Sequence, residues 1–142
     1  ALGFTLTSLD NIMSGCEVVV CVAPLTPGTR GMIGERELNL LQPNSVFVNV
    51  SRGPIVDSDA LVARLKKGDI SAGLEVFDPD PPPPGHEVLT LPNVFMTPHS
   101  SSGRVCHGEF FELMVDEMER FFAGHETWFD ITPNSVANRK GT

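Results

Sequence analysis

The sequence predicts an α/β protein in which helices cover both faces of a parallel sheet. Four short apolar runs, at 17–23, 45–50, 71–76 and 94–97, have the length of strands. Segments with helical spacing or with loop-forming residues separate these runs. Because the runs are apolar throughout instead of alternating with polar residues, we expect both faces of each strand to be buried, as is typical of parallel sheets.

The first half of the chain supplies two of the strands. Ser8 is a candidate N-cap for a short helix that precedes the first strand, "EVVVCVA" at 17–23. The prolines and glycines of "PLTPGTRGMI" (24–33) predict a loop. A short helix is expected over "GERELNLLQ" (34–42), followed by the second strand, "SVFVNV" at 45–50.

The second half repeats the alternation and ends in a long helix. Asp57 is a candidate N-cap for a helix over "SDALVARLKKG" (58–68), whose last glycine is a stop signal. The third strand and a proline-rich loop (77–93) lead to the fourth strand. Apolar residues at helical spacing then predict a helix over 104–122, and the tail at 124–142 has little periodicity.

Composition limits the possible partners and the compartment. The 142 residues are enough for one domain with a sizeable core, and 10 Lys and Arg against 18 Asp and Glu give a net charge of -8. This balance argues against nucleic acid or an acidic membrane surface as partner. The three cysteines, Cys16, Cys21 and Cys106, form no CxxC pair, which favours reduced thiols in the cytoplasm. No metal-binding pattern and no membrane-spanning apolar stretch occur in the sequence.

Three chemically useful side chains follow strand ends. Arg52 comes directly after the second strand, Asp80 lies in the loop after the third, and His99 follows the fourth. Ligands of parallel sheets bind beyond the carboxyl ends of the strands, so these side chains are expected at one rim. Each also has a simpler interpretation: Arg52 can pair with Asp57, His99 can be an ordinary loop histidine, and Asp80 can serve a turn. The three together favour an anion-binding catalytic site.

The motifs "SRGPIVD", "GLEVFDPDP" and "LPNVFMTPH", in this order and spacing, resemble the D-isomer-specific 2-hydroxyacid dehydrogenases. The resemblance extends from about Ser8 to Gly124. It implies an oxidoreductase that transfers a hydride between NAD or NADP and C2 of a small 2-oxo or 2-hydroxy acid. It also implies a doubly wound, Rossmann-type sheet of which this chain supplies half, and a homodimer for the full-length enzyme.

The resemblance assigns the catalytic roles to Arg52, Asp80 and His99. A planar guanidinium can hold the carboxylate and the ketone oxygen of a 2-oxo acid together. A histidine near neutral pH can give a proton to the ketone oxygen and take it back in the reverse reaction. A carboxylate on the other ring nitrogen fixes the tautomer and favours the imidazolium. The family usually has glutamate where Asp80 stands, and Asp78 is the rival partner for the histidine.

The resemblance also implies a set of cofactor contacts. Glu75 departs from the aspartate usual at its position, where the family contacts the nicotinamide carboxamide, and has the longer reach. The implied cofactor-binding residues are Ala23, Pro24, Val50, Ser51, Arg52, Glu75, His99 and Ser102.

No GxGxxG motif occurs in the sequence, and no strand and helix precede Ser8 to hold one. We therefore interpret residues 1–102 as the second half of a dinucleotide-binding domain, and 103–142 as a helix and tail that return to a substrate domain. On this interpretation the chain is a fragment of a larger enzyme and is inactive alone.

Two other functions stay open at this level. A dinucleotide-sensing interaction protein, like the transcriptional corepressors that resemble this family, can retain the same three side chains. An inactive structural remnant is the other possibility. The sequence does not specify the acid substrate, and it does not distinguish NAD from NADP.

Overall fold

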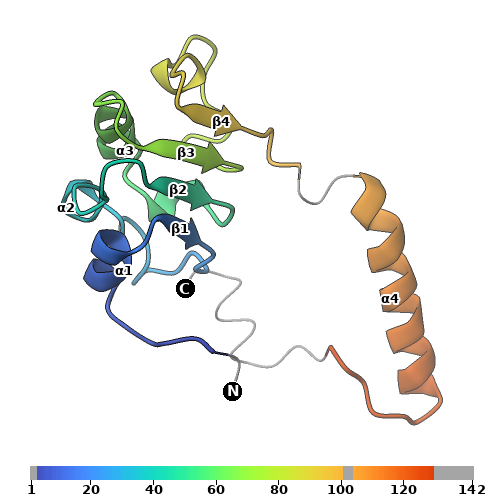
Figure 1. The fold of residues 1–142 in the computed structure, drawn as a ribbon. Helices are drawn as coiled ribbons and strands as arrows, with labels where there is room; N and C mark the ends of the chain where they lie inside the picture. Colours follow the sequence, from blue (N-terminus) through green and yellow to red (C-terminus); the bar gives the residue numbers. More distant parts are fainter. Residues whose placement is uncertain (1–2, 101–103, 130–142) are drawn as a thin grey trace.

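The computed structural model describes residues 3–100 and 104–129, with the backbone alone over 104–107. Four parallel strands form one sheet in the order β1-β2-β3-β4 (Figure 1). The strands are β1 (Val18–Cys21), β2 (Val46–Asn49), β3 (Ser71–Leu74) and β4 (Val94–Met96). The helices are α1 (Leu9–Gly15), α2 (Glu35–Leu38), α3 (Ser58–Leu65) and α4 (Arg104–Phe122), with short 3-10 turns η1 (Gly53–Ile55) and η2 (Glu87–Leu89). The predicted fold class, a parallel half-sheet with flanking helices and a long C-terminal helix, is confirmed.

Local signals in the sequence set the helix starts. The Ser8 hydroxyl accepts a hydrogen bond from the Asn11 amide at 3.2 Å, and this bond caps α1. The Asp57 carboxylate accepts from the Ala60 amide at 3.0 Å and caps α3 in the same way. Both predicted N-caps are therefore confirmed.

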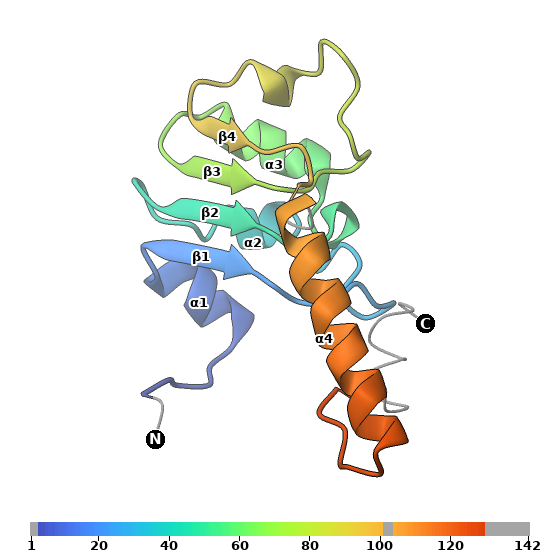
Figure 2. The same ribbon diagram turned by 90° about the vertical axis from the view of Figure 1, so that its right-hand side faces the viewer.

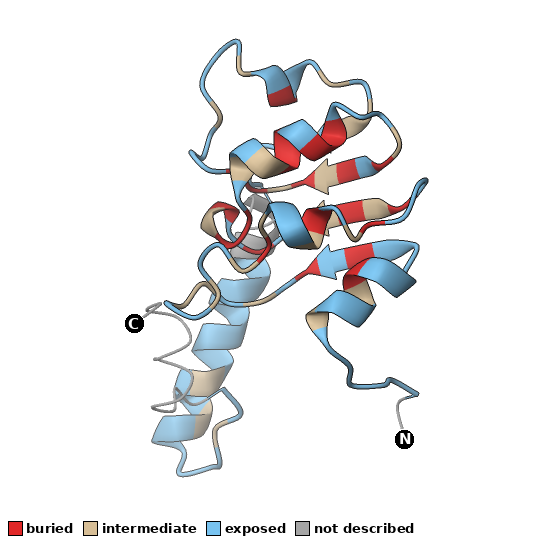
Figure 3. Ribbon diagram, turned by 90° about the vertical axis from the view of Figure 1, so that its left-hand side faces the viewer, coloured by how far each residue is buried: buried red, intermediate tan, exposed pale blue. Residues whose placement is uncertain are grey.

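The helices α1, α2 and α3 lie on one face of the sheet (Figures 1 and 3). The inward-facing residues of the strands are buried, as the burial of Phe47 and Leu74 illustrates. On the other face, Val18, Val20 and Phe95 are 56%, 51% and 72% exposed. The expectation that helices cover both faces is therefore wrong for the described residues. Each crossover between parallel strands is right-handed, and all of them here advance in the same direction, so the connecting helices fall on the same side.

A buried arginine joins α3 to the end of α2. Arg64 is 5% exposed, and its guanidinium donates to the backbone carbonyls of Leu38 at 3.2 Å and Leu41 at 3.0 Å. It also forms an ion pair with Asp69, and this hydrogen-bonded contact lowers the pKa of the Asp69 carboxyl from its ordinary value. The arginine thus adds a donor to the last carbonyl of α2 and supplies one to the Leu41 carbonyl in the segment that follows.

The inner face of the sheet also contains Cys21. Its side chain is buried, and burial raises the pKa of the thiol. Packing, rather than nucleophilic chemistry, therefore accounts for this cysteine.

The predicted helix over 104–122 is confirmed as α4, which stands apart from the sheet (Figures 1 and 2). Its apolar side chains, among them Phe111 and Met118, are exposed. The segment after it turns back onto the helix, because the Trp128 amide donates to Glu117 and the Arg120 guanidinium lies 3.9 Å from the Trp128 ring centre. Within the described ranges, no helix combines the length and the apolar character needed to cross a bilayer.

Candidate active site

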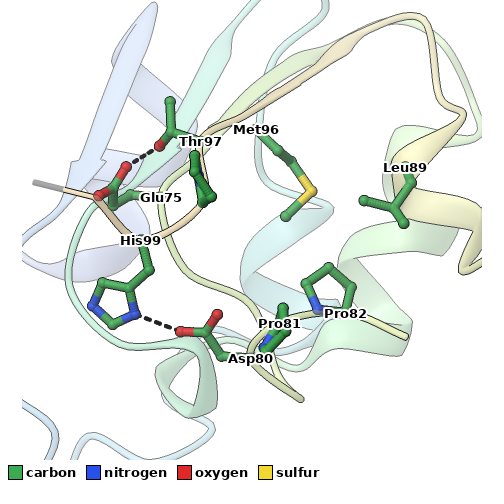
Figure 4. A pocket seen from close by; sticks show the side chains of 9 residues that line it. Glu75, Asp80, Pro81, Pro82, Leu89, Met96, Thr97 and His99 are labelled. Carbon is green, nitrogen blue, oxygen red and sulfur yellow. Dashed lines mark hydrogen bonds and ion pairs between the residues drawn. The ribbon is translucent and has the colours of Figure 1, made fainter. Parts of the chain in front are cut away.

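The loops that leave the carboxyl ends of β2, β3 and β4 meet at one rim of the sheet, because the strands are parallel. The register places Leu74 of β3 beside Met96 of β4, so that the residues directly after them, Glu75 and Thr97, are also neighbours. The Thr97 hydroxyl donates a hydrogen bond to the Glu75 carboxylate (Figure 4). The first polar pair of the rim therefore follows from strand pairing.

His99 and Asp80 form the second polar pair. The His99 Nδ1 atom lies 2.6 Å from the Asp80 Oδ2 atom, and the two side chains are 41% and 33% exposed (Figure 4). His99 has a φ of 50°, in the left-handed region that residues other than glycine seldom adopt. Its amide donates to the Thr97 carbonyl at 3.0 Å. This turn directs the imidazole towards the loop after β3.

The structure also distinguishes the two aspartates of "DPDP". Asp80 lies against His99, whereas Asp78 lines a separate hollow beside Arg30 and Asp57. The contact that the sequence analysis expected of Asp80 is therefore present.

A cavity of about 750 Å³ opens beside these pairs. Figure 4 shows the polar side chains of Glu75, Thr97, Asp80 and His99 on one side of it and apolar side chains on the other. The lining residues are Glu75, Asp80, Pro81, Pro82, Leu89, Met96, Thr97, Pro98 and His99. Among the described residues, no group of His, Cys, Asp and Glu side chains is suited to hold a metal ion.

Arg52 lies at the neighbouring strand end and does not line this cavity. Its side chain is exposed, and its guanidinium donates to the Ser51 carbonyl at 2.7 Å. The structure therefore brings Asp80, Glu75 and His99 together at the cavity. Arg52 lies at the same rim of the sheet but outside the cavity lining.

The remaining predicted cofactor contacts surround the ends of β1 and β2. Ala23 is partly buried, whereas Pro24 and Val50 are exposed. Ser51 is buried, and its hydroxyl donates to the Ala23 carbonyl. Ser102 lies outside the described residues.

The sequence analysis missed Asn49, which is the last residue of β2 and is 2% exposed. Its Oδ1 atom accepts from the Ser51 amide at 3.1 Å, and its Nδ2 atom donates to the Arg52 carbonyl at 3.3 Å. Its only signal in the sequence is a polar residue in an apolar run, "SVFVNV".

Comparisons with known proteins show the family to which this chain belongs. Residues 1–101 match the profile of the D-isomer specific 2-hydroxyacid dehydrogenase NAD binding domain. The chain belongs to the D-isomer specific 2-hydroxyacid dehydrogenase family. It is 42% identical over 116 residues to glyoxylate/hydroxypyruvate reductase B of Enterobacter agglomerans, covering 81% of this chain and 35% of the relative. It is 35% identical over 137 residues to glyoxylate reductase of Korarchaeum cryptofilum, covering 95% of this chain and 40% of the relative.

Solved structures of this family share the fold. The D-isomer specific 2-hydroxyacid dehydrogenase of Xanthobacter autotrophicus, in complex with NADPH and MES, is 36% identical. It superposes with a TM-score of 0.74, over 89% of this chain and 52% of its own. The chain thus spans about two fifths, or less, of the length of the two reductases above.

Proposed function

We propose that the complete protein is an NAD(P)-dependent dehydrogenase or reductase of small 2-oxo and 2-hydroxy acids. In this proposal residues 1–102 form the second half of its dinucleotide-binding domain, and 103–142 form the helix and tail that return to a substrate domain. The observation that carries the proposal is the contact of 2.6 Å between His99 and Asp80 at the rim of the sheet. Family membership and the reductase names of the relatives support it.

His99 is the proposed general acid and base. Its Nδ1 atom faces Asp80, so the proton for the ketone oxygen is on Nε2, the nitrogen on the other side of the ring. The Asp80 carboxylate holds the ring in one orientation and stabilises the imidazolium, which gives the proton during reduction and forms when the proton is taken during oxidation. During oxidation of the 2-hydroxy acid, Nε2 takes the hydroxyl proton instead.

Arg52 is the proposed anchor for the acid. Two parallel hydrogen bonds from a guanidinium match the geometry of a carboxylate. The side chain is exposed, and its contact with the Ser51 carbonyl can be exchanged for a contact with an anion that binds more strongly. A rotation of this side chain would turn it towards the cavity.

The residues at the ends of β1, β2 and β3 fit a dinucleotide. Val50, directly after β2, offers an exposed apolar surface that is 48% accessible, and Pro24 in the loop after β1 is also exposed. Glu75 offers carboxylate oxygens that accept hydrogen bonds from an amide such as the nicotinamide carboxamide. Ala23, Ser51, Arg52, His99 and Ser102 complete the proposed contact set. When bound, the cofactor supplies or accepts the hydride at C2.

The compartment and the oligomeric state are also proposals. The free thiols of Cys16 and Cys21 favour the cytoplasm. We propose a homodimer from the family resemblance.

Replacement of His99 with alanine in the full-length protein tests the acid–base assignment. We expect the turnover number to fall by about 10²–10⁴, while the dissociation constant for NADH changes much less. Steady-state kinetics with glyoxylate and fluorescence titration with NADH measure the two quantities. His125→Ala, at an exposed histidine after α4, is the matched control. A His99→Ala enzyme with the turnover of the control variant contradicts the assignment.

The pH profile of ketone reduction can show whether Asp80 or Asp78 is the partner of His99. Asp80→Asn removes the charge beside the imidazolium, so the pH optimum of ketone reduction should move to lower pH. Asp78→Asn should leave the optimum in place, because this carboxylate lines the other hollow. The reverse pattern would assign the role to Asp78.

A further inference from the structure

We propose that Asn49 is a positioning residue for Arg52: its buried amide fixes the loop that presents the guanidinium to the carboxylate of the substrate. The inference rests on the proposed role of Arg52 as anchor. It adds a residue that does not touch the substrate and that acts through the backbone of the arginine.

The two hydrogen bonds of Asn49 carry the inference. Asn49 ends β2 on the inward face, where Phe47 is also fully enclosed, so an apolar side chain would suit the position. A buried amide is unfavourable unless its polar atoms are bonded. Here Oδ1 accepts from the Ser51 amide and Nδ2 donates to the Arg52 carbonyl. The amide therefore bonds to the two peptide groups on either side of the Ser51–Arg52 segment, Val50–Ser51 and Arg52–Gly53.

Two further contacts restrict the same loop. The Ser51 hydroxyl donates to the Ala23 carbonyl after β1. On the other side, Gly53 lies so close to the Phe77 carbonyl after β3 that a Cβ atom there would be 1.9 Å from the oxygen. The loop is thus attached to both neighbouring strands. Arg52 lies between these attachments, and Asn49 bonds directly to its carbonyl.

A purely structural role for Asn49 is the competing explanation. In that case its replacement lowers stability and the fraction of active protein, but it does not act through Arg52. A positioning role instead makes the effect of an Asn49 substitution depend on the presence of the guanidinium. A double-mutant cycle measures this dependence.

The experiment uses the full-length protein and oxamate, a carboxylate analogue of a 2-oxo acid that is not reduced. Calorimetric titration in the presence of NADH measures its dissociation constant for wild type, Asn49→Asp, Arg52→Ala and the double variant. Asp keeps the acceptor for the Ser51 amide but puts an acceptor against the Arg52 carbonyl. We expect Asn49→Asp to weaken oxamate binding about tenfold, and the NADH dissociation constant to change by less than about twofold. In the Arg52→Ala background, Asn49→Asp should have no further effect.

The outcomes separate the two proposals. If Asn49→Asp weakens oxamate binding equally with and without the guanidinium, or leaves it unchanged in the wild-type background, the positioning role is wrong. If Arg52→Ala leaves oxamate binding unchanged, the anchor role itself is wrong. Should Asn49→Asp fail to fold, as judged by circular dichroism, Asn49→Ser gives the same test. Its hydroxyl is too short to replace the bond to the Arg52 carbonyl, and the expected coupling is the same.

Discussion

Replacing Gly53 with alanine tests whether the close approach of two backbones at the rim of the sheet is needed for activity. A Cβ atom on Gly53 would lie 1.9 Å from the Phe77 oxygen, 2.2 Å from its carbonyl carbon and 2.8 Å from the Asp78 nitrogen. All three are backbone atoms, so no side-chain rotation relieves the overlap. The loop after β2 would have to move away from the loop after β3.

The size of the movement follows from the distances. Ordinary contacts begin at 3.4 Å, so the two loops must separate by about 1.5 Å. Overpacking of this kind costs about 1–3 kcal/mol of unfolding free energy. A misplacement of about 1 Å between groups that act together can lower activity about 10²-fold. We therefore expect Gly53→Ala to lower kcat/KM for glyoxylate about 10²-fold, in addition to the loss of stability.

Urea denaturation and steady-state kinetics on the full-length protein measure the two effects. Gly73→Ala in β3 is the matched control, because its Cβ atom would be 3.7 Å from the nearest Val48 methyl group, an ordinary contact. The control should stay within about 1 kcal/mol of wild type and remain active. A Gly53→Ala protein with the stability and kcat/KM of the control would refute the argument from backbone contact.

Four further predictions use the same protein or its residues 1–142 alone. Arg52→Lys, which keeps the charge but loses the paired hydrogen bonds, should lower kcat/KM for glyoxylate at least about 30-fold; Arg30→Lys is the control, and equal kinetics of the two variants would contradict the anchor role. Arg64→Met leaves the Leu41 carbonyl without its donor, whereas the Leu38 carbonyl still accepts from the Leu41 amide, so urea denaturation should give a loss of about 1–3 kcal/mol. The hydrogen bond from Arg64 lowers the pKa of the Asp69 carboxyl below its ordinary value of 3.8. The stability advantage of wild type over Asp69→Asn should therefore be constant at higher pH and should disappear as the pH falls below about 4. An advantage that grows in acid would contradict the pairing. Residues 1–142 alone should self-associate through β1, an edge strand of the described sheet, and should not bind NADH. Light scattering should show smaller assemblies after Val20→Lys. A stable monomer with micromolar affinity for NADH would contradict the domain assignment.

Local signals predicted the elements better than their arrangement. The caps Ser8 and Asp57 and the four strands were predictable because each depends on a few adjacent residues. The helix expected over 34–42 is a single turn, Glu35–Leu38, and the chain then turns through Asn44, which has a φ of 68°. The uncovered face of the sheet was not predictable from apolar runs, because it depends on the order in which the strands are added.

The candidate site shows the same division. The resemblance of the motifs to the family selected His99 and Asp80, with Asp78 as the rival, and the structure brings Asp80 and His99 into contact. The bond between Glu75 and Thr97 requires the register of β3 and β4, which no single segment contains. Asn49 was missed because its hydrogen bonds to the Ser51 amide and the Arg52 carbonyl depend on the turn after β2, whose geometry the sequence does not reveal.

The rim of the sheet consists of two parts, and the backbones of Gly53 and Phe77 meet between them. The loop with Arg52 is attached to β1 through Ser51, and the turn with His99 is attached to the loop after β3 through Asp80. Gly53 packs on Phe77 at the start of that β3 loop, so we expect this contact to influence the distance between Arg52, the proposed anchor for the acid, and His99, the proposed proton donor. Reduction of a 2-oxo acid requires both groups on one small molecule, with its carboxylate adjacent to its ketone. A change at this contact should therefore lower the rate of the chemical step for short and long 2-oxo acids alike, because the carboxylate and the ketone are adjacent whatever the length of the rest of the acid.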